Sequence, residues 1–115
     1  MNGSDTVQIG EAMPCVGSVA FHAGYEFVVT WQAGRRQGKT DVVDLAPVLL
    51  AHKMYRPLRD SPQMLTSVHL IDGGAAIGWG EGDVMDLAAT TIERLAEESL
   101  SAVKVRQKFE VGLRP

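Results

Sequence analysis

Several residue types on which protein chemistry often depends are scarce in this sequence. It contains one cysteine, Cys15, among 115 residues, so no disulfide can form within the chain. No activating base is evident beside Cys15, and we interpret it as a small buried side chain or a thiol at a strand edge. No apolar run approaches the ~20 residues that span a bilayer, and residues 1–13 lack the basic start and apolar stretch of a signal peptide. The sequence therefore predicts a cytoplasmic protein.

Positive charge is also scarce, because the formal net charge is −3. A general polyanion binder needs a basic excess that displaces counterions from phosphate groups. Binding of nucleic acid over the whole surface is therefore not expected. The argument is weaker against a small local basic patch.

Metal-binding and phosphate-binding patterns are missing as well. The three histidines (His22, His52 and His69) stand far apart, and no Cys-x-x-Cys motif occurs, which excludes a structural zinc site. Four acidic residues match no calcium-binding loop, and we interpret them as a solvated rim: Asp72, Glu81, Asp83 and Asp86. The glycine-rich stretch 78–83 has no lysine to complement a phosphate, so we interpret it as a loop. We expect neither a metal nor a cofactor.

The residues that are present suffice for one globular domain. The hydrophobic fraction is 45%, a value typical of globular chains, and at this length a core can form without disulfides or metal. We expect a flexible leader over residues 1–14, a single domain over 15–108 and a tail over 109–115.

Alternating and helical patterns predict an α+β fold of short antiparallel strands in hairpins, with small helices and a longer C-terminal helix. The expected strands are 16–21, 25–31, 39–44, 67–71 and 75–79, with a few extended residues over 84–87. The expected helices are 47–52, 62–65 and 89–108. Turns are expected at residues 22–24 and 72–74, where glycines permit positive φ angles.

One strand and one helix define the expected core. Four residues share one face of the strand over residues 25–31, with Leu70, Ile77 and Ile92 packed against them: Tyr25, Phe27, Val29 and Trp31. Ile92, Leu95, Ala96, Leu100 and Val103 form the apolar stripe of the C-terminal helix. Its polar side is expected to carry Glu93, Arg94, Glu97, Glu98 and Lys104.

Two groups of basic residues and one tryptophan are the candidate binding residues. Arg35, Arg36 and Lys39 form the densest basic cluster, on a predicted hairpin loop. Arg56 and Arg59 form a second pair. Each group is either solvated charge, with Arg59 paired to Asp60, or a patch for an acidic partner or nucleic acid. Trp79, between two glycines, is either packed in the core or an anchor for a partner.

Several segments resemble a bacterial family called domain of unknown function 2442. They are Val43-Asp44-Leu45-Ala46-Pro47, Tyr55-Arg56-Pro57-Leu58-Arg59-Asp60, Val68, Ile77-Gly78-Trp79 and Asp86-Leu87. The resemblance covers roughly residues 16–96 and implies a compact α+β fold with no settled activity. Family members often have proline after the tryptophan, whereas Gly80 stands here. Some members continue into a helix-turn-helix domain, for which we expect no room in this chain, and others are encoded beside small toxin-like proteins.

Three functions remain open from the sequence. The first is a non-enzymatic module that binds another protein, such as a toxin-like neighbour, or a second copy of itself. The second is a nucleic-acid-associated regulator that uses Arg35, Arg36 and Lys39. The third is a small enzyme, although no nucleophile, base and orienting group can be assembled from the sequence. The apolar stripe of the C-terminal helix, continued by Val105 and Phe109, predicts a homodimer. The alternatives are a tail that frays after Leu100 or one that folds back over the sheet of its own chain.

Overall fold

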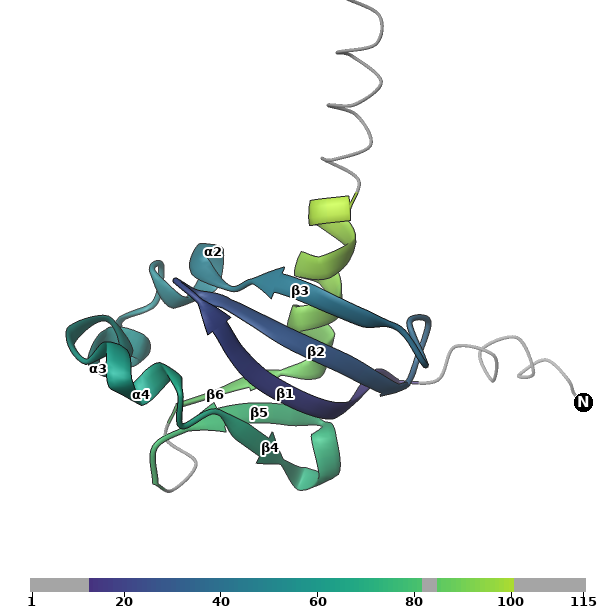
Figure 1. The fold of residues 1–115 in the computed structure, drawn as a ribbon, viewed down its shortest axis with the longest axis horizontal. Coiled ribbons are helices and arrows are strands. Elements are labelled where there is room, and N and C mark those ends of the chain that lie inside the picture. Colours follow the sequence, from purple (N-terminus) through teal and green to yellow (C-terminus); the bar gives the residue numbers. More distant parts are fainter. Residues whose placement is uncertain (1–12, 82–84, 101–115) are drawn as a thin grey trace, which may run out of the picture.

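A computed structural model describes residues 13–81 and 85–100 and contains two three-stranded antiparallel sheets (Figure 1). The first sheet has the order β1-β2-β3, with β1 (Cys15–Ala23), β2 (Glu26–Ala33) and β3 (Thr40–Asp44). The second has the order β4-β5-β6, with β4 (His69–Ile71), β5 (Ala76–Trp79) and β6 (Met85–Ala88). The predicted α+β class is confirmed.

Short helical segments connect the two sheets, and a longer helix follows the last strand. The connecting segments are α2 (Ala46–Leu49), η1 (Lys53–Tyr55), α3 (Arg56–Asp60) and α4 (Pro62–Leu65), and the 3-10 turn η2 (Asp72–Gly74) joins β4 to β5. The C-terminal helix comprises residues 89–100 of the described chain. Its predicted extension over residues 101–108 lies outside the described residues.

The first sheet buries one face, as the alternating pattern predicts. Phe27, Val29 and Trp31 of β2 are buried together with Val43 of β3. The prediction is wrong for Tyr25, which is only partly buried. Gly24 has a φ of 59° and forms a two-residue turn with Tyr25, so Tyr25 precedes β2 instead of lying within it.

The two sheets meet along β1. Gly74 of η2 lies so close to β1 that a Cβ atom there would clash with the carbonyl oxygen of Val16, and its φ of 106° also favours glycine. The thiol of Cys15 donates a hydrogen bond to the carbonyl oxygen of Gly73 over 3.1 Å. Cys15 is therefore a thiol at a strand edge, as the sequence suggested.

The helical connection is tied to the second sheet by a tyrosine. Tyr55 is buried and donates a hydrogen bond from its hydroxyl to the carbonyl oxygen of Asp86 over 2.6 Å. Burial, and secondarily the nearby Asp86 carboxylate, raise the pKa of Tyr55. No helix was predicted over residues 56–60, where α3 lies. Proline in a first helical turn, where no N–H is needed, is compatible with the helix.

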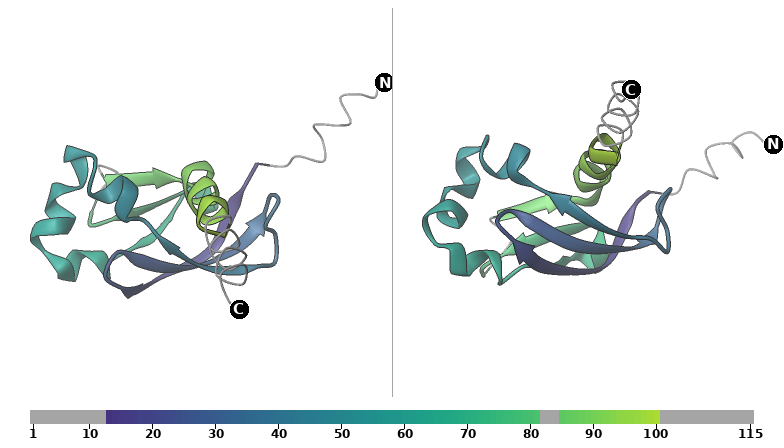
Figure 2. Two further views of the ribbon diagram at one scale, coloured as in Figure 1. Left: turned by 90° about the horizontal axis from the view of Figure 1, so that it is seen from above. Right: turned by 45° about the horizontal axis from the view of Figure 1, so that its top comes forward.

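The C-terminal helix runs behind the first sheet and continues beyond β3, as two views show (Figures 1 and 2). Ile92, Leu95 and Ala96 are buried against the core, which confirms this part of the predicted apolar stripe. Leu100, at the end of the described helix, is 42% exposed. The helix therefore packs along its first turns and projects past the edge of the sheet at its end.

Candidate interaction surface

Arg36, from the predicted basic cluster, is bound to a carboxylate of its own chain. It lies in the loop between β2 and β3 and donates two hydrogen bonds to Asp41, Nε to Oδ2 over 2.6 Å and Nη2 to Oδ1 over 2.7 Å. Trp31 donates its Nε1–H to the same carboxylate over 2.7 Å. The hydrogen bonds from Arg36 hold the pKa of Asp41 below its ordinary value and raise the pKa of Arg36. Arg36 thus stabilises the hairpin tip.

Arg35 joins the hairpin tip to the C-terminal helix. Its Nη2 lies 3.0 Å from a carboxylate oxygen of Glu93 and 3.0 Å from one of Glu97. The prediction that Glu93 lies on the polar side of the helix is wrong, because Glu93 is 6% exposed. Burial of this carboxylate is tolerable because the guanidinium of Arg35 compensates its charge. The hairpin tip and the helix are consequently held together by charge as well as by apolar packing.

The third member of the cluster, Lys39, is exposed. The loop brings the three basic residues together, but both arginines face carboxylates. The cluster therefore offers much less net positive charge than its sequence suggests.

The second basic pair is divided between two environments. Arg56 is exposed. Arg59 donates hydrogen bonds from Nη1 to the carbonyl oxygens of Leu49 (2.8 Å) and His52 (3.3 Å), which lie at and just beyond the end of α2. The expected ion pair of Arg59 with Asp60 is therefore wrong. The last carbonyl groups of a helix have no partner within the helix, and here the guanidinium of Arg59 supplies one. A surface ion pair with Asp60 would contribute little.

Trp79 lies in the core and offers no surface to a partner. It is fully buried and makes edge-to-face contacts with Phe27 and Tyr55, with ring centroids 5.6 and 6.1 Å apart. The structure confirms the first interpretation of Trp79, in which its side chain packs in the core. The anchor interpretation is wrong, since a partner anchor must be accessible.

Strand β3 presents an open edge at the limit of the first sheet. Val43 pairs with Phe27 and Asp41 pairs with Val29 of β2. The N–H of Leu45 bonds to the carbonyl of Tyr25, and the N–H of Trp31 bonds to the carbonyl of Lys39. The hydrogen-bonded pairs of this antiparallel ladder therefore alternate through Val43 and Asp41, and the backbone groups of the intervening Val42 point away from β2. The same holds for the positions on either side, Thr40 and Asp44. The loop and turn backbone hydrogen bonds of the described residues include none from these three residues.

The exposed side chains at the middle of the β3 edge also form an uncharged surface that a partner can contact. Val42 is 54% exposed at the centre of β3. It continues a cross-strand row with Val28 of β2 and Ala20 of β1 on the outer face of the sheet. The next row joins Thr30 and Thr40, whose hydroxyls are 3.0 Å apart. The middle of this face is thus uncharged.

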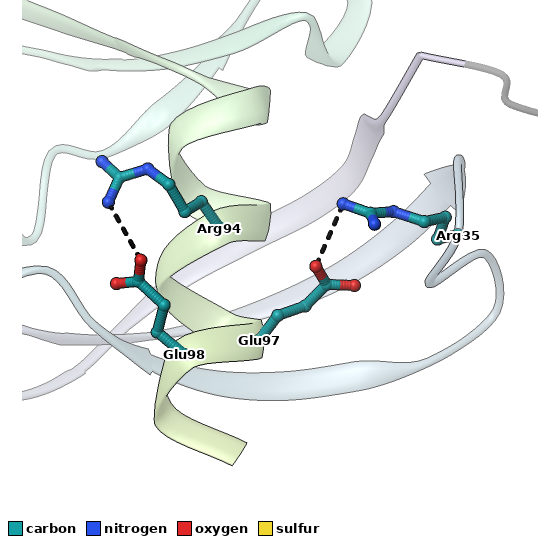
Figure 3. A pocket seen from close by; sticks show the side chains of 4 residues that line it. All are labelled: Arg35, Arg94, Glu97 and Glu98. Atoms are coloured by element: carbon teal, nitrogen blue, oxygen red, sulfur yellow. Dashed lines mark hydrogen bonds and ion pairs between the residues drawn. The ribbon is translucent and has the colours of Figure 1, made fainter. Parts of the chain in front are cut away.

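The projecting helix stands beside the open edge, and we call the two together the β3 ledge. It comprises the outward backbone of Thr40, Val42 and Asp44 and the distal helix residues Arg94, Glu97, Glu98 and Leu100. Figure 3 shows four charged side chains around an open cavity of about 460 Å³ between the hairpin tip and this helix: Arg35, Arg94, Glu97 and Glu98. On the helix, Arg94 lies 3.4 Å from Glu98. The ledge therefore combines an unpaired strand with a charged helical wall.

The described residues form neither a metal site nor a membrane-spanning helix. Within residues 13–81 and 85–100, no three histidine, cysteine, aspartate or glutamate side chains come together as metal ligands. No helix in this part of the chain is long and apolar enough to cross a membrane. Asp83, part of the predicted acidic rim, lies outside the described residues.

Comparison with known proteins adds no relative. No family model matches the chain, and neither a curated protein nor a solved structure matches it.

Sequence reasoning missed the role of Asp41, although a signal for it exists. Asp41 has the same parity in β3 as the buried Val43, so alternation places it on the core side. A carboxylate there requires a cation or several donors, and Arg36 stands five residues earlier. The open edge of β3 had no such signal, because the order of strands in a sheet is not visible in the local pattern.

Proposed function

We propose that this protein is a non-enzymatic interaction module that binds an extended segment of another protein along the β3 ledge. The observation that carries the proposal is the open edge of β3, with Val42 exposed at its centre. An unpaired edge strand is a template for addition of a further strand. Natural proteins usually protect such an edge with a cover, a proline or an inward-pointing charge; β3 contains no proline, and its inward-pointing Asp41 is neutralised by Arg36.

The distal turn of the C-terminal helix gives the bound segment a second contact surface. In strand-addition complexes the main-chain hydrogen bonds provide affinity, while pockets for alternate side chains provide specificity. A strand added to β3 would lie in front of the helix where it projects past the sheet (Figure 1). The last turns of this helix carry Leu100 and the charged residues Glu97 and Glu98, which favours apolar and basic side chains in the partner.

The partner is proposed to be a small protein with an extended segment of this chemistry. The resemblance to domain of unknown function 2442 supports a toxin-like protein encoded nearby, as occurs for some members. The pairing of Arg35 and Arg36 with carboxylates supports a protein partner over nucleic acid. A protein of this function needs no catalytic group.

Selection of peptides can test the proposal even though the partner is unidentified. Random peptides displayed on phage would be selected on the wild-type chain and then measured against Val42→Pro and Val42→Thr. Proline removes the outward N–H of Val42 without removing a bond to β2, because that N–H points away from β2. Threonine keeps the N–H and a similar shape, and serves as the matched control.

The expected result is a set of extended peptides with alternating apolar and basic residues. They should bind Val42→Thr like the wild type and bind Val42→Pro at least tenfold more weakly, as each lost main-chain hydrogen bond weakens a bound strand by about a factor of ten. Peptides that bind both variants equally would contradict the proposed function, as would the absence of binding peptides from both the full chain and a chain that ends at Ser101. Circular dichroism and thermal unfolding of Val42→Pro would first establish that the variant is folded.

A further inference from the structure

The chain carries a segment of the chemistry that suits the β3 ledge. After the described helix the sequence alternates over residues 103–113. Five of the six odd positions are apolar, and three of the five even positions are basic. The apolar ones are Val103, Val105, Phe109, Val111 and Leu113, and the basic ones are Lys104, Arg106 and Lys108. A period of two is typical of a strand with one apolar face, so this pattern fits a strand better than the helix expected from the sequence through residue 108.

Charge favours contact between this segment and the rest of the chain. Residues 101–115 contain four basic and one acidic side chain, a formal charge of +3. Residues 1–100 contain seven basic and thirteen acidic side chains, a formal charge of −6, and the two values give the net −3 of the chain. Asp44 and Glu98 are exposed on the ledge itself. The two parts of the chain are thus of opposite sign.

A short connection directs the segment to a different copy of the chain. Only Ser101 and Ala102 separate the described helix from Val103, and two residues span at most ~7 Å. The helix packs behind the first sheet and leads past β3 (Figures 1 and 2), while packed layers of secondary structure lie roughly 10 Å apart. The connection is therefore too short to bring the whole segment back to β3 of the same chain.

We infer that residues 103–113 of one copy add as a strand to the β3 ledge of a second copy, and that the exchange is reciprocal. The inference rests on the proposed function, since it uses the same open edge. Reciprocal exchange closes the assembly as a two-fold dimer, and a short link between an element and its domain favours such exchange over closure within one chain. In this dimer the segment covers the edge until a partner segment displaces it.

Sedimentation of the full chain provides the first test. The wild type and Val42→Thr are expected to be dimers at tens of micromolar, whereas Val42→Pro is expected to be a monomer. The double variant Phe109→Ser/Val111→Ser, which leaves the described residues unchanged, is expected to dissociate as well. Glu110→Gln, on the opposite parity, is the matched control and should remain dimeric.

A synthetic peptide of residues 103–113 provides the second test. All buried core residues of the described chain lie between Val16 and Ala96, so a chain that ends at Ser101 keeps the core, and thermal unfolding would verify its fold. The peptide should bind this chain, and Val42→Pro should weaken binding at least tenfold. Exchange itself would appear as pairing of two differently labelled full-length copies after mixing.

Each contrary outcome separates the inference from the proposed function. A monomeric wild type whose truncated form binds the peptide would place the segment on the β3 edge of its own chain and overturn the exchange. A dimer unaffected by Val42→Pro and by Phe109→Ser/Val111→Ser would overturn it too. If the peptide does not bind but selected peptides bind with sensitivity to Val42→Pro, the inference fails and the proposed function stands. If no peptide depends on Val42, both fail.

Discussion

At the β1 edge of the first sheet, another part of the chain lies directly against the backbone. At the β3 edge, none of the loop hydrogen bonds of the described residues covers the outward groups. Gly74 approaches the carbonyl of Val16, and Gly73 accepts a hydrogen bond from the Cys15 thiol, so the two glycines of η2 cover the start of β1. The central residue of β3, Val42, is instead exposed. The difference shows that the end of β1 at Cys15 and Val16 is covered by another part of the chain, whereas the centre of β3 is exposed.

The largest effect on stability is expected from a substitution in β2, the strand between the two edges of the first sheet. Phe27 is fully buried and contacts Phe21 and Trp79, so Phe27→Ala should lower the free energy of unfolding by about 3–5 kcal/mol. Chemical denaturation would measure the loss. Val28→Ala, one residue away on the outer face, should lower it much less. An unchanged melting temperature in Phe27→Ala would show that the register of β2 is wrong.

A single methyl group added at Gly74 should disrupt the contact between η2 and the start of β1. Gly73→Ala and Gly74→Ala both place alanine at a positive φ, which costs about 1–3 kcal/mol. Gly74→Ala adds a clash with the Val16 carbonyl, whereas nothing lies within 4 Å of a Cβ at Gly73. Denaturation should therefore show a clearly larger loss for Gly74→Ala. Equal losses would mean that the close approach of Gly74 to the carbonyl of Val16 does not restrict the residue at position 74.

The hairpin tip that leads into β3 should depend on the charge of Asp41. Asp41→Asn should lower the free energy of unfolding by about 1.5–3 kcal/mol at neutral pH, because its hydrogen bonds to Arg36 lose their ionic character. Asp44→Asn, whose side chain can still accept a hydrogen bond from the N–H of Ala46, should change it little.

The pH dependence of this loss follows from the direction of the pKa shift. The pKa of Asp41 is below its ordinary value of 3.8 in the folded protein. The stabilisation from Asp41 is therefore complete above pH 3.8 and is lost as the pH falls further through the folded-state pKa. Denaturation curves of the wild type and Asp41→Asn should converge over that interval. A constant difference at acid pH would indicate that the loss arises from packing.

The open edge should tolerate a charge. In the chain that ends at Ser101, which lacks residues 103–113, Val42→Lys is expected to change the free energy of unfolding by no more than about 0.5 kcal/mol, since its side chain stays in solvent. Val43→Lys, at the adjacent buried position, should prevent folding. A large loss in Val42→Lys would show that something covers the β3 edge in solution.

The smallest effect is expected with nucleic acid. The net charge is −3, and Arg35 and Arg36 are paired with carboxylates, so no tight binding to DNA should occur at physiological salt. Nanomolar, sequence-selective binding in a gel-shift experiment would contradict this expectation and restore the basic cluster as an interface.

Local patterns were sufficient for most of the fold and for little of the candidate surface. The alternation in β2 and the glycines at 73 and 74 act over neighbouring residues, so the strands and the second hairpin were predictable. The burial of Glu93 was not, because it depends on Arg35, 58 residues away in the sequence. The role of Arg59 was missed for a similar reason, since its carbonyl partners belong to another helical segment. Long-range pairing is therefore the part of the structure that local patterns do not predict.

The contrast between the two indole groups gives the protein a pair of natural reporters. Trp31 donates its N–H to Asp41 at the hairpin tip, whereas the buried N–H of Trp79 has no hydrogen-bond partner among the described residues. A strong hydrogen bond to a carboxylate moves an indole proton resonance to lower field, so the two signals should be well separated in a spectrum of nitrogen-labelled protein. Since these are the only tryptophans in the sequence, one signal follows events beside the ledge and the other follows the integrity of the core.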